Sequence, residues 1–183
     1  MTKEEVFVSV DVESSGPIPG EFSMLSLGAC VVGNTDQNFY VEIKPLNINY
    51  KPKALKVCGL DFGKLVMEGV EAKEAMQRFY NWIKENFLDK NLRPVFVSFG
   101  EYDYMFVNWY FEKFLGHNPF SFNGLDIKSF AMGVLGCTWT GTSKRNIPSE
   151  FHSGLPHTHN ALDDAKKQAE LFLRLLEYRK AGL

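Results

Sequence analysis

The stretch Val6-Phe7-Val8-Ser9-Val10-Asp11-Val12-Glu13 places a valine at every second position. Alternation with a period of two, in residues that are β-branched or aromatic, predicts a strand with its valines on one face. Asp11 and Glu13 then leave the opposite face together, about 7 Å apart along the chain. Two anions on one face repel each other, so they are either solvated at a frayed strand end or held together by cations.

The residues that follow this strand predict an antiparallel meander. Ser14 to Gly20 contains two Gly and two Pro and therefore reads as a loop. Met24–Val32 and Asn38–Ile43 are apolar or aromatic runs that predict two further strands. Three strands joined by short connections are expected to pair with one another in antiparallel order.

Helices and strands alternate in the rest of the chain. Apolar periodicity predicts helices and strands over these ranges: helices Ala72–Phe87, Tyr104–Leu115, Lys128–Leu135 and Ala161–Tyr178, and strands Pro94–Phe99 and Leu125–Ile127. Gly136–Thr158 is polar and lacks strong periodicity, and loops of this length tend to be functional or mobile. This order predicts an α/β fold with a mixed sheet.

Composition limits the class of protein. The chain has 183 residues, of which 45% are hydrophobic and 23% charged, so a single globular domain over residues 1–183 is expected. A net charge of −2 leaves no global positive field, so a nucleic acid would have to be held by local features. No apolar run has the length of a membrane helix, and the first residues carry acids that a signal peptide lacks. We therefore expect no membrane partner and a cytoplasmic location.

Asp103 lies at the start of an apolar helical face. On a helical wheel it falls within about 80° of five apolar or aromatic positions, Phe106, Val107, Tyr110, Phe111 and Phe114. A lone carboxylate there would be costly to desolvate unless a cation or hydrogen bonds compensate it. The alternative is that Asp103 only caps a helix that begins at Tyr104.

The same wheel separates two adjacent acids of the last helix. Asp163 falls among charged residues, whereas Asp164 shares its stripe with Gln168 and Leu171. Asn160 is a good N-cap, and Asp163, three residues later, can complete the capping interaction. Asp163 is therefore expected to face water in a structural role and Asp164 to face the protein.

Four inward acids from separate stretches, Asp11, Glu13, Asp103 and Asp164, indicate a metal site. Carboxylate oxygens favour hard cations such as Mg²⁺ or Mn²⁺. His159 lies at the rim of such a site and is suited to general-base work, although a loop His is also commonly a solvated surface residue. His157 could instead pair with His159 around zinc, but no thiolate or further His cluster accompanies them.

Three motifs resemble the signatures of the DEDDh 3′–5′ exonucleases. They are Asp11-Val12-Glu13 followed by Ser14-Ser15-Gly16, Asp103 before an aromatic helix, and the run His159-Asn160-Ala161-Leu162-Asp163-Asp164-Ala165. The resemblance implies a ribonuclease-H-like fold, a five-stranded mixed sheet flanked by helices with its first three strands antiparallel. It also implies two Mg²⁺ or Mn²⁺ ions held by Asp11, Glu13, Asp103 and Asp164, with His159 as the general base. Relatives of this kind are often homodimers.

The implied substrate is the 3′ end of RNA or DNA, short or single-stranded. The terminal hydroxyl would be read by Glu13 or by the backbone near Ser14. Ser14 and Ser15, at positions where relatives often have Thr, would bind substrate. In the long loop, Trp139 could stack on a base and Lys144 and Arg145 could pair with phosphate, although an ordinary surface loop would have the same residues. Tyr102, Tyr104 and Trp109 are expected in the core, and the basic cluster Lys51, Lys53 and Lys56 is equally well explained as a solvated face.

The match departs from the resembled family at Phe99, where many relatives carry Asn four residues before the third acid. Asp126 matches an acid common in relatives but is better explained as a cap at a strand end. Two other functions stay open. One is a metal-dependent phosphoesterase for nucleotides or small phosphates, and the other is a nucleic-acid-binding module of the same fold without turnover.

Overall fold

The computed structural model describes residues 3–154 and 158–182, so His157 lies outside the described residues. Its centre is a five-stranded sheet in the order β3-β2-β1-β4-β5. The strands are β1 Glu5–Ser14, β2 Met24–Val31, β3 Asn34–Glu42, β4 Arg93–Ser98 and β5 Leu125–Asp126. The first three pair antiparallel, and β4 and β5 add in parallel beside β1. The mixed sheet expected from the sequence is confirmed.

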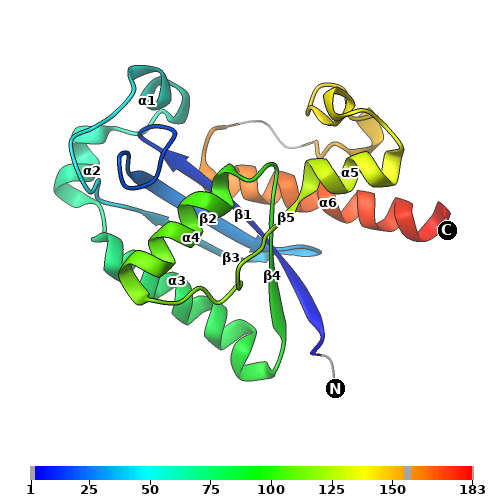
Figure 1. Ribbon diagram of the computed structural model, residues 1–183, viewed down its shortest axis with the longest axis horizontal. Coiled ribbons are helices and arrows are strands. Elements are labelled where there is room, and N and C mark those ends of the chain that lie inside the picture. The colour runs from blue at the N-terminus through cyan, green and yellow to red at the C-terminus, as the bar shows by residue number, and fades with distance from the viewer. Residues whose placement is uncertain (1–2, 155–157, 183) are drawn as a thin grey trace.

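Helices cover both faces of this sheet. They are α1 Pro52–Cys58, α2 Phe62–Glu68, α3 Ala72–Asn86, α4 Tyr102–Leu115, α5 Ile127–Leu135 and α6 Ala161–Gly182, with 3₁₀ turns η1 Leu88–Lys90, η2 Trp139–Thr142 and η3 Ser149–Phe151. Figure 1 shows α3 and α4 on one side of the central strands and α5 and α6 on the other. One core cluster lies under α3 and α4, and a second lies under α5 and α6.

The alternation in β1 assigns its residues to these two cores. Val8, Val10 and Val12 are buried in the cluster that α3 and α4 cover. On the other face, the ring centroid of Phe7 lies 5.2 Å from that of Phe172 in α6. Asp11 and Glu13 share that second face, because side chains two residues apart on a strand point the same way. The end of β1 therefore presents both acids towards α6.

The sequence patterns missed two short helices. Both α1 and α2 have seven residues, which is too few for a helical period to stand out. They are held by tertiary contact, since Cys58 and Leu65 pack with Leu25 in a small separate core. The expected loop 136–158 likewise contains η2 and η3. In the described part of the chain, no helix is long and apolar enough to cross a membrane.

Candidate active site

The first turn of α6 lies directly against the sheet because β2 has a glycine there. Gly28 pairs with Asp11 in the antiparallel register. A Cβ atom on Gly28 would lie only 2.2 Å from the backbone nitrogen of Leu162. Asn160 caps the same turn, since its Oδ1 accepts hydrogen bonds from the amides of Leu162 (3.0 Å) and Asp163 (3.3 Å). The start of α6 is therefore fixed next to Asp11.

Gly28→Ala should separate these two elements. The added methyl group meets backbone atoms rather than a flexible side chain, so α6 must move before it can fit. We expect exonuclease kcat/KM to fall by roughly 100-fold, since a displacement of about 1 Å can cost that much. Steady-state kinetics and far-UV circular dichroism would check this. Gly133→Ala in α5 is the control for replacing a glycine by alanine, because no atom lies within 4 Å of the added methyl group there. Unchanged kinetics in Gly28→Ala would show that the close approach is not needed.

The two adjacent acids of α6 face opposite ways, as the wheel predicted. Asp163 is exposed and its Oδ2 accepts a hydrogen bond of 2.8 Å from Thr158 Oγ1. Asp164 is only 3% exposed. Its carboxylate comes together with two other predicted site residues, because possible ligand atoms of Glu13, His159 and Asp164 all lie within 4.8 Å of one another.

His159 reaches this position on a strained backbone. Its φ of 53° is in the left-handed region, which few residues other than glycine adopt. The residue directly precedes the N-cap Asn160, so the chain turns sharply into α6 at this point. Such conformations cost free energy and are retained where surrounding structure holds them, often at functional sites.

Asp103 belongs to the same acidic group but comes from the other side of the sheet. It lies in the first turn of α4 and is 7% exposed. Its Oδ1 accepts a hydrogen bond of 3.1 Å from the backbone amide of Val12 in β1. The helix begins at Tyr102 with Glu101 as its N-cap, so the alternative that Asp103 only caps a helix starting at Tyr104 is wrong.

Burial and mutual repulsion raise the pKa values of Asp11, Glu13 and Asp103. Burial, followed by the charges of Asp103, Glu13 and Asp164, raises the pKa of Asp11 well above its ordinary value. Burial also raises the pKa of Glu13 and of Asp103 to about 7, while the Lys144 ammonium opposes the rise. Carboxylates in this state are stabilised by added positive charge. A set of oxygen donors with one imidazole fits hard divalent cations.

These pKa shifts predict how stability depends on pH without divalent cations. Unfolded Glu13 and Asp103 ionise near 4.5 and 3.8, whereas the folded protein keeps their protons up to about 7. Between these values the unfolded state binds fewer protons, so stability falls as pH rises and levels off above about 7. In EDTA we expect a lower Tm at about pH 8 than at about pH 5. The difference should be about 2–4 °C for each kcal/mol by which the free energy of unfolding falls.

Asp103→Asn should flatten this slope and raise the metal-free Tm at about pH 8, because one buried charge is gone. Glu112→Gln, at an exposed position on the same helix, is the control for loss of an acid. A Tm that is equal at both pH values in wild type would contradict the assigned burial of charge.

Gln168 is a member of the site that the sequence patterns did not identify. It is 3% exposed, and its Nε2 donates a hydrogen bond to Asp11 Oδ1. Its Oε1 accepts one of 3.0 Å from the backbone amide of Phe99. Phe99, where many members of the resembled family have Asn, therefore contributes its backbone amide to this arrangement. A polar residue on the buried stripe of the last helix was the only signal in the sequence.

A pocket of about 400 Å³ opens beside Glu13. Its lining includes Ser14, Lys51, Lys53 and Tyr102. The Tyr102 hydroxyl donates to the carbonyl of Gly16 (2.9 Å) and lies 2.6 Å from Ser14 Oγ. The residue is 40% exposed, so the expectation that Tyr102 lies in the core is wrong.

Ser15 does not reach this pocket. It is fully buried, its hydroxyl donates to the carbonyl of Asn49 (2.8 Å), and it accepts from the amide of Ser23 (2.9 Å). With the hydroxyl used in this way, Ser15 holds the loop after β1 in place. The hydroxyl is therefore engaged within this loop, and the expected contact of Ser15 with substrate stays a prediction.

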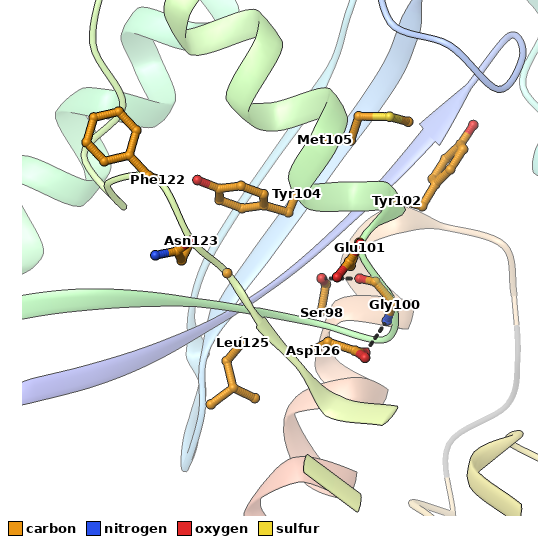
Figure 2. Close-up of a pocket in the computed structure, with 11 residues that line it drawn as sticks. Ser98, Gly100, Glu101, Tyr102, Tyr104, Met105, Phe122, Asn123, Leu125 and Asp126 are labelled. Carbon is orange, nitrogen blue, oxygen red and sulfur yellow. Dashed lines mark hydrogen bonds between the residues drawn. The ribbon is translucent and has the colours of Figure 1, made fainter. Parts of the chain in front are cut away.

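A larger pocket of about 590 Å³ lies beyond the start of α4. Figure 2 shows Tyr104 projecting from α4 towards Phe122, which lies on the loop that follows this helix, and Met105 also lines the pocket. Its charged lining residues are acidic, and one of them, Asp126, is occupied as the N-cap of α5, accepting from the amides of Lys128 and Ser129. The expected capping role of Asp126 is confirmed, and this pocket does not suit an anion.

The expected contacts in the long loop are divided between two places. Lys144 and Arg145 line a third pocket together with Gln168, which binds Asp11. Trp139 lies in η2 and is 53% exposed, with the Lys128 ammonium 3.9 Å from its ring centroid. It lines none of the three pockets described, so the structure does not bring Trp139 to the acids.

The acids and His159 lie in one continuous region of sequence match. A family model described as an exonuclease, of the RNase T type, matches residues 8–172. The chain belongs to this exonuclease family. It is 42% identical over 177 residues to the Escherichia coli protein named 3′–5′ DNA exonuclease Cap18, a match that covers 96% of this chain and 94% of that protein. Membership in the family identifies the protein as an enzyme, a 3′–5′ exonuclease of the DEDDh type.

Two further comparisons agree with this family. Ribonuclease T of Wigglesworthia glossinidia brevipalpis is 26% identical over 188 residues, which is 96% of this chain and 86% of that protein. The solved nuclease domain of 3′hExo, a DEDDh family member bound to rAMP, is 14% identical with a TM-score of 0.75. That match covers 94% of this chain and 92% of the other. The ribonuclease-H-like fold implied by the motifs is confirmed.

Proposed function

We propose that this exonuclease removes nucleotides from single-stranded 3′ ends of DNA, using two divalent cations and His159 as the general base. The observation that carries the proposal is the meeting of Glu13, His159 and Asp164 within 4.8 Å, next to the half-buried Asp11 and the buried Asp103. These five residues come from three separate parts of the chain. Repulsion among the four acids makes the arrangement costly unless cations bind there.

The four acids would hold the cations, which we propose to be Mg²⁺ or Mn²⁺. S. pombe Pop2p, a structure with the same fold (TM-score 0.65, 14% identity), was solved in a form with Mg²⁺ and Mn²⁺ bound. When bound, such cations lower the pKa of water and stabilise charge on the attacking and leaving oxygens of a phosphodiester. The raised pKa values of Asp11, Glu13 and Asp103 fit carboxylates that need this charge.

His159 would take the proton from the attacking water. An imidazole is the side chain best suited to accept a proton near neutral pH. The left-handed backbone at His159 and the cap at Asn160 fix the ring beside Glu13 and Asp164. Gln168 would hold the Asp11 carboxylate in one orientation, because its amide bridges Asp11 and the backbone of Phe99.

The pocket beside Glu13 would receive the 3′-terminal nucleotide. The half-exposed ring of Tyr102 offers a face on which a base can stack. Glu13 lies in this pocket and can read the terminal hydroxyl by a hydrogen bond, with the backbone near Ser14 as a second possible partner. Lys51 and Lys53 add positive charge at the rim, where a sugar-phosphate backbone would pass.

A direct assay compares 5′-labelled single-stranded DNA, the same sequence as RNA, a blunt duplex, free nucleotides and a phosphomonoester. We expect a ladder of shortened products from single-stranded DNA with Mg²⁺ or Mn²⁺ and none in EDTA. The 42% identity with an enzyme named as a DNA exonuclease supports the choice of DNA. Hydrolysis of free nucleotides or phosphomonoesters without a ladder would indicate a phosphoesterase instead. Binding of DNA without any product would indicate a module that has lost turnover.

A further inference from the structure

A third pocket, of about 290 Å³, lies between α6 and the segment that contains η2 and η3. Its lining is Phe99, Lys144, Arg145, His152, Ser153, Lys167, Gln168 and Leu171. Three of these residues are cationic, one is an imidazole and none is an acid. We call this set the cationic pocket. Its volume is near the lower limit of ordinary ligand sites, which suits a small group rather than a large molecule.

The positive charges of the cationic pocket are available to a ligand. Within residues 3–154 and 158–182, the ion pairs involve none of Lys144, Arg145 and Lys167. The Lys144 ammonium lies 5.1 Å from the ring centroid of Phe99, which is another lining residue of this pocket. Three cations around one small cavity, without a carboxylate among its lining residues, favour an anion.

The wall of the pocket is held in place by hydrogen bonds. His152 Nε2 lies 2.9 Å from the carbonyl of Ile147 and donates to it, which leaves Nδ1 for another partner. Arg174 on α6 donates to the carbonyls of Glu150 (2.9 Å) and His152 (2.5 Å), so η3 is fastened to α6. Ser153, also in the wall, has a buried hydroxyl without a hydrogen-bond partner in the described structure. An unpaired buried donor of this kind calls for a further acceptor.

The cationic pocket adjoins the acids but is distinct from the pocket beside Glu13. Gln168 forms part of its wall and donates to Asp11, and the Lys144 charge lowers the pKa of Asp11, Glu13 and Asp103 against the larger effect of burial. The two pockets have no lining residue in common. Consider a strand with its last nucleotide in the pocket beside Glu13 and its scissile phosphate at the acids. The cationic pocket then offers this strand a second binding point.

We propose that the cationic pocket binds the internucleotide phosphate next to the scissile one, on its 5′ side. This inference rests on the proposed function, because it takes the acids as the place of cleavage. Arg145 can bind two phosphate oxygens at once, while Lys144 and Lys167 act as point charges. The pocket would thus require a strand of at least two phosphates and exclude single nucleotides as good substrates.

The test uses the full chain and single-stranded DNA in which one linkage is a neutral methylphosphonate. With the neutral linkage second from the 3′ end, we expect wild-type kcat/KM for removal of the last nucleotide to fall roughly ten- to hundredfold, since a hydrogen-bonded charge pair is lost. With the neutral linkage farther upstream, the rate should stay near that of unmodified DNA. Arg145→Met and Lys167→Met should raise KM on unmodified DNA and show a smaller effect of the neutral linkage.

Lys113→Met is the matched control, because Lys113 is an exposed lysine in the last turn of α4, outside the cationic pocket. It should retain the full wild-type discrimination. Lys144 is not used as the probe, since its charge also acts on the acids themselves. Activity on unmodified DNA in wild type tests the proposed function separately.

Two results would overturn the inference while leaving the exonuclease assignment intact. One is equal wild-type rates with and without the neutral second linkage, and the other is unchanged discrimination in Arg145→Met and Lys167→Met. The last measurement is inhibition of the wild-type enzyme by inorganic phosphate. If it inhibits wild type competitively while the neutral linkage has no effect, the cationic pocket takes a free phosphate group and not one within the strand.

Discussion

Asp164→Asn should leave the enzyme almost inactive, whereas Asp163→Asn should work nearly as well as wild type. Asp164 is buried beside Glu13 and His159, so its loss removes a proposed cation ligand. We expect kcat/KM to fall by more than about 100-fold, because losing even the groups that orient metal ligands costs about 10–100-fold. Asp163 is exposed, and its hydrogen bonds with Thr158 Oγ1 and Asn160 Oδ1 lie at the start of the helix.

Steady-state kinetics on single-stranded DNA, with Mg²⁺ varied from limiting to saturating, would measure both variants. Asp163→Asn should lose at most about 1 kcal/mol of stability through its weaker helix start. Thermal unfolding of both proteins in EDTA serves as the control for folding. The reverse ranking of activities would show that the outward acid, and not the buried one, takes part in the reaction.

His159→Ala should lower kcat by about 10²–10⁴-fold, the usual contribution of a general base. Because the proposed role is proton transfer, the Mg²⁺ or Mn²⁺ concentration needed for half-maximal activity should hardly change. Any rise of wild-type kcat with pH that depends on this base forms a limb of the pH–rate profile that should be absent from the variant. The measurement is a pH–rate profile for each protein under conditions in which chemistry limits turnover.

His117→Ala provides the control for this variant, since His117 is exposed at the end of α4 and stacks edge-on against Tyr80. It should keep wild-type kcat and the wild-type pH limb. If His159→Ala instead weakens metal dependence while the pH limb persists, His159 is a metal ligand and a different group accepts the proton.

Several features of the site could be predicted from local pattern alone. The alternation of valines in β1 placed Asp11 and Glu13 on one face, and the wheel of α6 separated Asp164 from Asp163. Both succeed because the period of a strand or helix is fixed by its backbone geometry. The ordered motifs around these acids also sufficed to identify the exonuclease family and its fold.

Other features depend on residues far apart in the chain, and only the tertiary structure decided them. Gly28 allows the backbone of α6 to lie directly against β2. Gln168 forms hydrogen bonds with both Asp11 and the backbone of Phe99. Tyr102 was expected in the core because it is a large aromatic residue. It is instead half-exposed, since its hydroxyl binds Ser14 and Gly16 at the edge of a pocket. Sequence spacing fixes the direction of a side chain within its own element. Packing between elements decides what that side chain meets, because it brings together groups that no local period relates.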